Sequence, residues 1–215
     1  IAQEIFTDYT FLSLEMIQKF LEVSPYGTRC FLADYQDDGL VASEIIANAA
    51  RDFRINPLVL ITKLQVETSM IYMTASPTQY TLDRSTGCGC HDGMPECIAG
   101  TEGFRVQVRC AADAFRGYLD DLASRGATIS GWSVGSEKTS LDGFLVRPQN
   151  AATAALYTYT PWVLPYEGGN WLFWNVYKKF SRHILANTFN HVPVALIDEG
   201  FFHLRKGLGK LLHEL

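Results

Sequence analysis

The stretch that decides how this chain folds is Asn56-Pro57-Leu58-Val59-Leu60-Ile61-Thr62-Lys63-Leu64-Gln65-Val66-Glu67-Thr68-Ser69. Asn-Pro favours the start of a helix, because the asparagine side chain caps the first turn and proline lacks an amide hydrogen that would have no partner there. We expect this helix to run to about Ile71. Four residues share one of its faces, because their spacing matches the helical repeat: Leu60, Leu64, Glu67 and Ile71.

Glu67 is the polar member of that face. A carboxylate is rarely placed among apolar side chains without a partner, because its burial costs free energy. Burial would favour the protonated carboxyl, which is the form that a general acid needs to protonate a glycosidic oxygen. The alternative is a glutamate at the edge of the apolar face that forms an ion pair with a lysine or an arginine. The spacing taken alone favours this alternative.

The rest of the chain reads as further helices joined by loops. Apolar residues at helical spacing and capping residues predict helices over residues 12–23, 40–53, 104–122, 150–157 and 170–180. Residues 74–103 hold many glycines and prolines, and an ordered loop of that length tends to be functional. Residues 126–148 predict turns and a hairpin. The fold class is therefore mainly α with a small β element.

Three of the five cysteines lie in the segment Thr86-Gly-Cys-Gly-Cys-His-Asp-Gly-Met-Pro-Glu-Cys97. One interpretation is a loop held by disulfides, which implies an oxidising compartment. The other is a zinc site formed by Cys88, Cys90, His91 and Cys97. The spacing differs from the paired Cys-x2-Cys motifs of zinc ribbons, so it favours disulfides. An odd number of cysteines leaves at least one without a partner in the chain.

Length, composition and charge limit the possible classes of protein. The 215 residues suit a single domain over 1–215, and 47% of them are hydrophobic. No apolar run approaches the length of a membrane span, so we expect no integral membrane segment. The net charge of −5 gives no basic surface for nucleic acid. Residues from Lys178 onward carry a net charge of +3. From about residue 185 we expect an amphipathic C-terminal helical extension that packs on the domain.

Three segments together resemble the family of goose-type lysozymes and soluble lytic transglycosylases. Residues 56–69 are similar to the family's catalytic helix, which opens with Asn-Pro and carries a glutamate. Gly103-Phe-Arg-Val-Gln107 resembles its Gly-Leu-Met-Gln segment with one extra residue, and Ala154-Ala-Leu-Tyr-Thr-Tyr-Thr-Pro161 resembles its Ala-Tyr-Asn-Ala-Gly motif. A closer likeness is to a divergent secreted branch. It carries Leu-Gln-x-Glu, a Thr-Gly-x-x-Cys loop, Gly-Phe-x-x-Gln and Ala-Thr-Ala-Ala-Leu-Tyr-x-Tyr-Thr-Pro, and all four patterns stand in this chain. The core motifs span residues 40–165.

The resemblance implies a lysozyme-like helical domain in which a hairpin and a loop wall a groove for glycan. Glu67 would be the general acid, and Tyr157 would hydrogen-bond Glu67 or the sugar. Gln107 would contact a sugar substituent, and Tyr159 would line the same groove. Ser69, one place after the usual serine position that Thr68 occupies, would make a local hydrogen bond. The disulfides implied are Cys90–Cys97 and then Cys88–Cys110, which leaves Cys30 unpaired.

Two reactions share this acid. A hydrolase needs a second carboxylate across the sugar, whereas a lytic transglycosylase uses the sugar's own 6-hydroxyl. The candidates for the second carboxylate are Asp83, Asp92, Glu96, Glu102 and Asp142, all in loop or hairpin regions. Aromatic residues suited to stacking on sugars lie in the same regions: Tyr72, Tyr80, Trp132, Tyr157, Tyr159 and Trp162. The sequence leaves the choice between the two reactions open.

The resemblance therefore predicts a secreted or periplasmic monomer that cleaves peptidoglycan or a related β-1,4 amino-sugar polymer, without a cofactor or metal. Because the body of the domain is acidic, a glycan with free amines is the substrate that its charge favours. One alternative is a cell-wall-binding module that kept the fold and lost catalysis. Another is a zinc-dependent wall peptidase or amidase that uses the Cys/His loop, although the five histidines are scattered: His91, His183, His191, His203 and His213.

Overall fold

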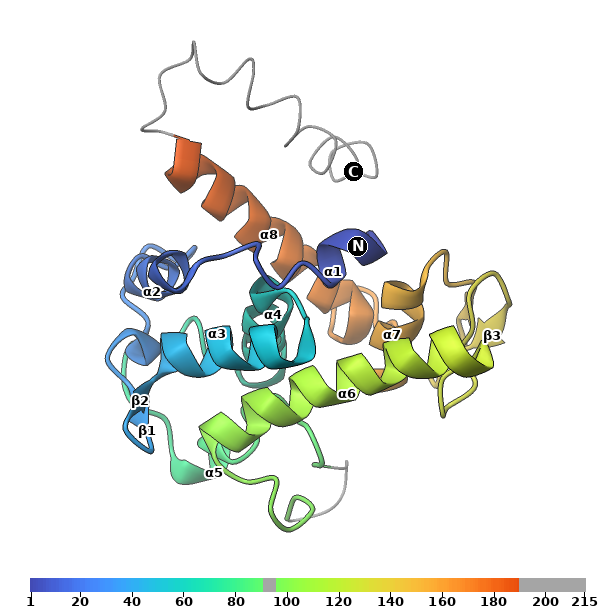
Figure 1. The fold of residues 1–215 in the computed structure, drawn as a ribbon, viewed down its shortest axis with the longest axis horizontal. Helices are drawn as coiled ribbons and strands as arrows, with labels where there is room; N and C mark the ends of the chain where they lie inside the picture. The colour runs from blue at the N-terminus through green and yellow to red at the C-terminus, as the bar shows by residue number, and fades with distance from the viewer. Residues whose placement is uncertain (91–95, 190–215) are drawn as a thin grey trace.

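The structure is a computed structural model, and it describes residues 1–90 and 96–189 of the chain. Helices dominate it, and the only sheets in the described residues are two short antiparallel hairpins. The mainly α fold with a small β element is therefore confirmed (Figure 1). The elements in chain order are α1 (Gln3–Phe6), α2 (Leu14–Glu22), η1 (Phe31–Ala33), β1 (Gln36–Asp37), β2 (Leu40–Val41), α3 (Ala42–Phe53), α4 (Pro57–Thr68), α5 (Gln79–Leu82), α6 (Phe104–Arg125), β3 (Lys138–Thr139), β4 (Leu145–Val146), α7 (Ala151–Tyr159) and α8 (Gly169–Phe189).

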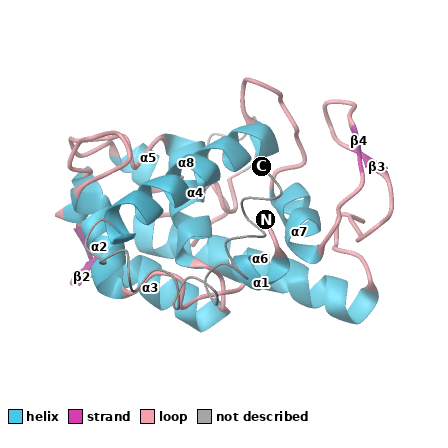
Figure 2. Cartoon of the chain, turned by 90° about the horizontal axis from the view of Figure 1, so that it is seen from above, coloured by secondary structure: helices cyan, strands magenta, loops and turns pink. Residues whose placement is uncertain are grey.

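Helix α4 lies at the centre of the molecule. Helices α3, α6 and α8 pack against it, and Figures 1 and 2 show them arranged around it. Every residue from Pro57 to Leu64 is buried, so the first two turns have no solvent-facing side. The apolar side chains of these helices join one hydrophobic core. The end of α4 that carries Glu67 is thus the part of the helix that approaches the surface.

The start of α4 follows the sequence prediction. Asn56 is fully buried, and its side-chain oxygen accepts a hydrogen bond from the Leu58 amide at 2.8 Å. Its side-chain nitrogen donates to the carbonyl of Ile5 at 2.9 Å, which ties α1 to the helix. Pro57 occupies the first turn, where a missing amide hydrogen costs nothing. One asparagine therefore caps the central helix and joins it to the N-terminal segment.

The end of α4 differs from the prediction. The helix stops at Thr68 rather than near Ile71, because Ser69 adopts a left-handed backbone conformation with φ of 56°. Met70 and Ile71 then turn into the core, where both are fully buried. Ile71 is therefore not part of the helical face that was predicted to hold Glu67, and that face ends at Leu64.

The other predicted elements are found with shifted bounds. The predicted hairpin within 126–148 is β3–β4, in which Lys138 pairs with Val146 and Thr139 with Leu145. The predicted helix 40–53 begins two residues late, because residues 40–41 form β2. Helix α8 continues to Phe189, and the short helices α1 and α5 and the β1–β2 hairpin were not predicted. The predicted C-terminal extension lies largely outside the described residues.

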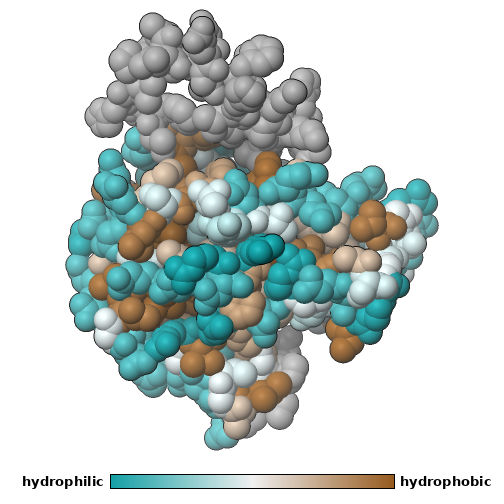
Figure 3. Space-filling view, in the orientation of Figure 1, coloured by the Kyte–Doolittle hydropathy of each residue, from teal (hydrophilic) through white to brown (hydrophobic). Residues whose placement is uncertain are grey.

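The outer face of the helices is polar. Hydrophilic side chains cover much of α3 and α6 in the view of Figure 3. Arg109 of α6 forms an ion pair with Asp52 of α3 at 2.8 Å. Residues 1–90 and 96–189 contain no helix with both the length and the apolar character that crossing a membrane requires.

Candidate active site around Glu67

Glu67 lies at the solvent-facing end of α4, and its partner is one turn earlier in the same helix. Oxygen Oε1 of its carboxylate accepts a hydrogen bond from Nζ of Lys63. The Glu67 side chain is 28% exposed, whereas the Lys63 side chain is 2% exposed. The prediction of a glutamate within an apolar face was therefore wrong. The alternative, a glutamate at the edge of that face in an ion pair with a lysine, describes the structure.

The amine of Lys63 is enclosed by three groups. It contacts the Glu67 carboxylate, it donates to the hydroxyl of Thr160 at 3.2 Å, and it lies 4.0 Å from the centre of the Tyr159 ring. Burial lowers the pKa of Lys63, and the charge of Glu67 and the hydrogen bond to it oppose that change. A carboxylate with one oxygen held by a buried amine has a fixed orientation.

The second carboxylate oxygen of Glu67 faces the loop that follows. A Cβ atom added to Gly87 would stand 3.0 Å from Oε2, and Gly87 has φ of 71°. Both features favour glycine, because it has no side chain and adopts this backbone conformation at little cost. The loop backbone thus approaches the carboxylate closely without covering it.

Gln107 holds this loop against α6. It is fully buried, and its Nε2 donates to the carbonyls of Cys88 at 2.7 Å and Thr101 at 2.6 Å. Its Oε1 accepts from the amides of Thr86 and Cys88, both at 3.2 Å, and from the Thr86 hydroxyl. Every polar atom of the amide is therefore used within the protein. The structure favours a role in positioning the loop, and the predicted contact with a sugar has no exposed atom to make it.

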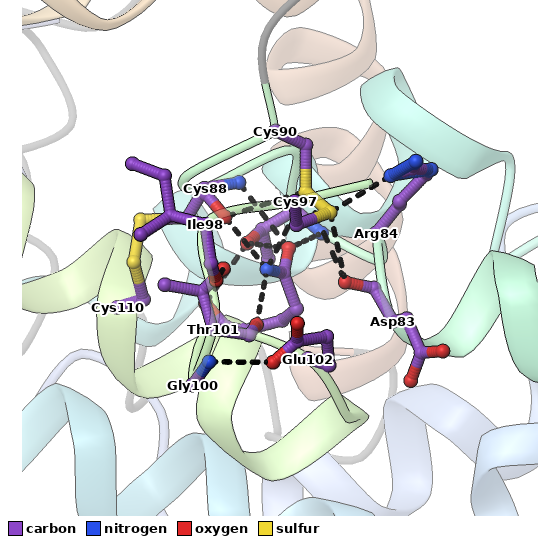
Figure 4. The surroundings of a disulfide bond; sticks show 12 residues. Asp83, Arg84, Cys88, Cys90, Cys97, Ile98, Gly100, Thr101, Glu102 and Cys110 are labelled. Carbon is purple, nitrogen blue, oxygen red and sulfur yellow. Dashed lines mark hydrogen bonds between the residues drawn. A yellow bond between two sulfur atoms is a disulfide. The ribbon is translucent and has the colours of Figure 1, made fainter. Parts of the chain in front are cut away.

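Two disulfides complete the loop, with the pairing that the resemblance implied. Cys88 is bonded to Cys110 on α6, and Cys90 is bonded to Cys97. Figure 4 shows both bonds beside the hydrogen bond from the Gly100 amide to Glu102. The zinc interpretation of these cysteines was wrong, because their sulfur atoms are bonded to one another; His91 lies outside the described residues. The disulfides fit an oxidising, extracytoplasmic compartment.

Cys30 is the free cysteine among the described residues, as expected from the odd number. It is buried, and its thiol donates to the carbonyl of Met70 at 3.3 Å. Burial raises the pKa of Cys30 to about 11. A thiol of this kind is protonated and unreactive at neutral pH, so it has a packing role.

The two tyrosines of α7 have different surroundings from those expected. Tyr159, not Tyr157, adjoins Lys63, and its hydroxyl donates to the carbonyl of Thr86 at 2.9 Å. Burial raises the pKa of Tyr159 well above its usual value, and the charge of Glu67 adds to the rise. Tyr157 packs on Trp132, with ring centres 4.9 Å apart, and makes no hydrogen bond to Glu67 in the described structure. Tyr159 is thus the tyrosine that α7 contributes to the Glu67 site.

Thr68, rather than Ser69, makes the local hydrogen bond expected beside the glutamate. Its hydroxyl donates to the carbonyls of Leu64 and Ser85, both at 3.1 Å. Ser69 is exposed, and its role is to end the helix through its backbone. The bond to Ser85 joins the end of α4 to the start of the loop.

Three candidates for a second carboxylate accept hydrogen bonds within the protein. Asp83 accepts from Gln79 at 2.8 Å, and Glu102 accepts from the Gly100 amide at 2.7 Å. Asp142 accepts from the amides of Val163 and Leu164, which anchors the β3–β4 turn to the segment after α7. Glu96 is exposed, and Asp92 lies outside the described residues. None of the described candidates forms a hydrogen bond or ion pair with the Lys63–Glu67 pair.

The aromatic residues divide into buried and exposed groups. Trp132 is 1% exposed and belongs to the interior, so it has no free face for stacking on a sugar. Tyr72 and Tyr80 are 61% and 64% exposed. The guanidinium of Arg84 lies 4.2 Å from the centre of the Tyr80 ring. Tyr72 and Tyr80 retain free surface of the kind that stacks on sugar rings.

Lys63 and Thr160 are the site residues that the sequence reasoning missed. Lys63 stands four positions before Glu67, a spacing that brings two side chains together on a helix, so this signal was present in the sequence. Thr160 had no such signal, because it is 97 residues away and reaches Lys63 only through the packing of α7. Searches against family models, curated proteins and solved structures find no match to this chain.

Proposed function

We propose that this protein is a lysozyme-like glycosidase that cleaves peptidoglycan or a related β-1,4 amino-sugar polymer, with Glu67 as the general acid. The observation that carries the proposal is the setting of Glu67. Its carboxylate stands at the exposed end of a buried helix, with one oxygen held by Lys63 and the other facing Gly87 in a disulfide-bonded loop. Fixed orientation and solvent access are what a proton donor to a bound polymer requires.

In the proposed reaction, the protonated carboxyl of Glu67 gives its proton to the oxygen between two sugars. The bond from that oxygen to the anomeric carbon breaks, and the electron pair stays with the leaving oxygen. Either water or the 6-hydroxyl of the same sugar then bonds to the anomeric carbon and returns a proton to Glu67. The second route needs no other carboxylate; of the candidates for one, Asp83, Glu102 and Asp142 each accept hydrogen bonds within the protein.

The charge of the chain supports a particular form of substrate. The net charge is −5, and the part before Lys178 carries −8, so an anionic polymer is repelled from the domain. A glycan with free amines carries positive charge and is attracted. We therefore include an N-deacetylated glycan as the better substrate, and equal rates on acetylated and deacetylated glycan would contradict this part of the proposal.

The ion pair itself favours a second candidate function. A glutamate that only stabilises a buried lysine would serve a catalytically inactive wall-binding module with the same fold. Such a module would bind the glycan and leave it intact. The two functions therefore differ in whether soluble fragments appear.

The test is mass analysis of fragments released from purified sacculi, native and chemically N-deacetylated. Wild type, Glu67→Gln and a control variant, Glu4→Gln, are compared. Glu67→Gln keeps the shape of the side chain and removes the acid, whereas Glu4 is exposed on α1. We expect fragments from wild type and Glu4→Gln and none from Glu67→Gln.

The fragment masses then identify the reaction. Hydrolysis adds water to each new end, whereas transglycosylation leaves an anhydro sugar. If wild type binds sacculi and releases nothing from either preparation, the glycosidase proposal is wrong and the binding module is the better account.

A further inference from the structure

Lys63 is the one charged side chain that is fully buried among the described residues. Such a position is costly, because a buried ammonium loses its hydration and must be neutralised or paired. An apolar residue of similar size would fill the same space without that cost. The presence of an amine beside Glu67 therefore calls for a chemical explanation.

The amine of Lys63 is buried, and its charged neighbour Glu67 is partly exposed. Thr160 and the ring of Tyr159, both contributed from the α7 end, contact Nζ, and the Tyr159 hydroxyl is occupied by the Thr86 carbonyl. In the described parts of α3, α6 and α8, no carboxylate forms an ion pair or hydrogen bond with the amine of Lys63. Glu67 is thus the charged group that faces Lys63, and Tyr159 is the other titratable one.

In the free site the amine of Lys63 and the carboxylate of Glu67 form an ion pair, and water reaches the Glu67 side chain, which is 28% exposed. A polymer lying over the carboxylate would displace that water. Loss of water makes both charged forms less stable, because a charge is costly in a medium of low dielectric. The neutral amine and the neutral acid are then favoured over the ion pair. The groups are already in hydrogen-bond contact, so a proton can move between them without a rearrangement of the backbone.

We infer that Lys63 is a positioning residue that protonates Glu67 when glycan covers the site. One Nζ–H bond breaks, an Oε1–H bond forms, and the ion pair becomes a neutral pair. Once the pair is neutral, the ion pair no longer fixes the carboxyl, and rotation about its last side-chain bond, a soft torsion in glutamate, presents the proton to the glycosidic oxygen. When the attacking hydroxyl returns its proton to Glu67, the proton moves back to Lys63 and the ion pair is restored.

This inference rests on the proposed function and explains how an ion-paired glutamate acts as an acid at neutral pH. In the active form, Lys63 and Glu67 together hold one titratable proton, which either residue can carry. Activity then falls at alkaline pH when the pair loses that proton, an event that belongs to the pair and not to one residue. Without the amine, the same fall would follow the loss of the proton from a lone carboxyl, which occurs at lower pH.

The experiment measures the initial rate of fragment release from the better sacculus preparation between about pH 4 and about pH 10, a range that spans both ionisations. The variants are Lys63→Met and Lys63→Arg. Methionine fills the space without an amine, so we expect the alkaline fall in rate to move down by about 2 pH units, with the highest remaining rate at the acid end. Arginine stays protonated and cannot supply its proton, so we expect a loss of about tenfold or more across the range.

A merely structural lysine gives a different result. Both variants would then change the rate by a constant factor at every pH, and the alkaline fall would stay where wild type has it; that outcome overturns the inference. Thermal unfolding of each variant shows whether it is folded. Wild type that releases no fragments at any pH would instead mean that the proposed function itself is wrong.

A second measurement needs no change at Lys63. Infrared difference spectra of wild type are recorded on addition of an N-acetylglucosamine oligomer or its deacetylated form, whichever matches the better sacculus preparation. We expect a protonated-carboxyl band to appear, and the same band to be absent in Glu67→Gln. Saturating oligomer without such a band would overturn the inference.

Discussion

At the scale of single residues, burial changes sharply within one turn of α4. Lys63 is 2% exposed and Glu67 is 28% exposed, although they are four positions apart on one helix. The difference arises because Ser69 ends the helix where it leaves the core, so the last turn meets solvent while the preceding turn does not. The same junction places Gly87 against the second oxygen of Glu67.

Gly87→Ala tests how closely the loop fits the carboxylate. Alanine at φ of 71° costs about 1 kcal/mol in folding free energy, and its Cβ at 3.0 Å from Oε2 displaces the Glu67 carboxyl by a few tenths of an ångström. A displaced proton donor loses rate, and we expect a fall of about tenfold in fragment release. Initial rates and thermal unfolding are measured on the same preparation.

The matched control is Gly27→Ala. Gly27 has φ of 76° and no atom within 4 Å of an added Cβ, so it shares the backbone cost without the contact. We expect a similar loss of stability and an unchanged rate. Equal rates in the two variants would show that the Gly87 contact is irrelevant to activity.

At the scale of elements, the disulfide-bonded loop and α6 behave as one unit because Gln107 joins them. Its amide serves two loop carbonyls and two loop amides from a fully buried position. The bond between Cys88 and Cys110 adds a covalent link between the same two elements. The position of Gly87, and with it the space above Glu67, depends on this junction.

Gln107→Leu should therefore loosen the loop. The substitution leaves buried carbonyl and amide groups without partners, and we expect a loss of about 3 kcal/mol in unfolding free energy. Denaturant unfolding measures the loss, and hydrogen exchange of the amides in 86–90 locates it. Gln149→Leu is the control, because Gln149 is exposed and its loss should cost less than about 0.5 kcal/mol. A loss no larger than that of the control would contradict the role given to Gln107.

Asp142 joins another pair of elements, the β3–β4 turn and the segment after α7. Partial burial alone would raise the pKa of Asp142, but hydrogen bonds from Ser140 and from the amides of Leu164 and Val163 outweigh it and lower the pKa to about 2. Because the pKa in the folded protein lies below the usual value, the carboxylate stabilises the fold above about pH 4, and this contribution is lost as the pH falls toward 2.

Asp142→Asn tests that pH dependence. The Tm of wild type should exceed that of the variant at neutral pH, and the difference should shrink between about pH 4 and about pH 2. Thermal unfolding of both proteins across this range gives the measurement. A difference in Tm that stays constant down to about pH 2 would mean that the Asp142 carboxylate does not provide the stabilisation.

Local signals account for the elements that were predicted correctly. Asn56-Pro57 fixes the start of α4 through contacts within three residues, and glycine- and serine-rich residues locate the β3–β4 hairpin. The end of α4 was misplaced because the left-handed turn at Ser69 is stabilised by the burial of Met70 and Ile71, which no local pattern reports. The likeness to Ala-Tyr-Asn-Ala-Gly led to Tyr157, whereas packing brought Tyr159 to Lys63.

At the scale of the whole molecule, net charge bears on which polymer the proposed site would attract. The chain carries −5 in total, while Figure 3 shows polar side chains over much of one face. Charges of one sign spread over a surface attract or repel a polymer at distances beyond any single contact. Salt shortens that distance to about 8 Å at physiological ionic strength.

Salt should therefore affect the two substrates differently. Raising the salt concentration from about 20 mM to about 200 mM should lower the rate on N-deacetylated sacculi several-fold, because the attraction is screened. The rate on native sacculi should rise or stay constant. The measurement is made at a pH where the free amines are charged, and the same decrease on both substrates would exclude attraction by net charge.

Short-range signals in the sequence establish where the central helix starts, which class of fold results and which cysteines lie near Glu67. These properties depend on capping, helical spacing and composition, which act over a few neighbouring residues. Only the tertiary structure decided that Glu67 pairs with a buried Lys63, that Gln107 holds the loop and that Tyr159 adjoins the amine. Those contacts join residues up to about a hundred positions apart. Packing of α4 against α6 and α8, and of α7 against α6, fixes which side chains meet and how much water reaches them.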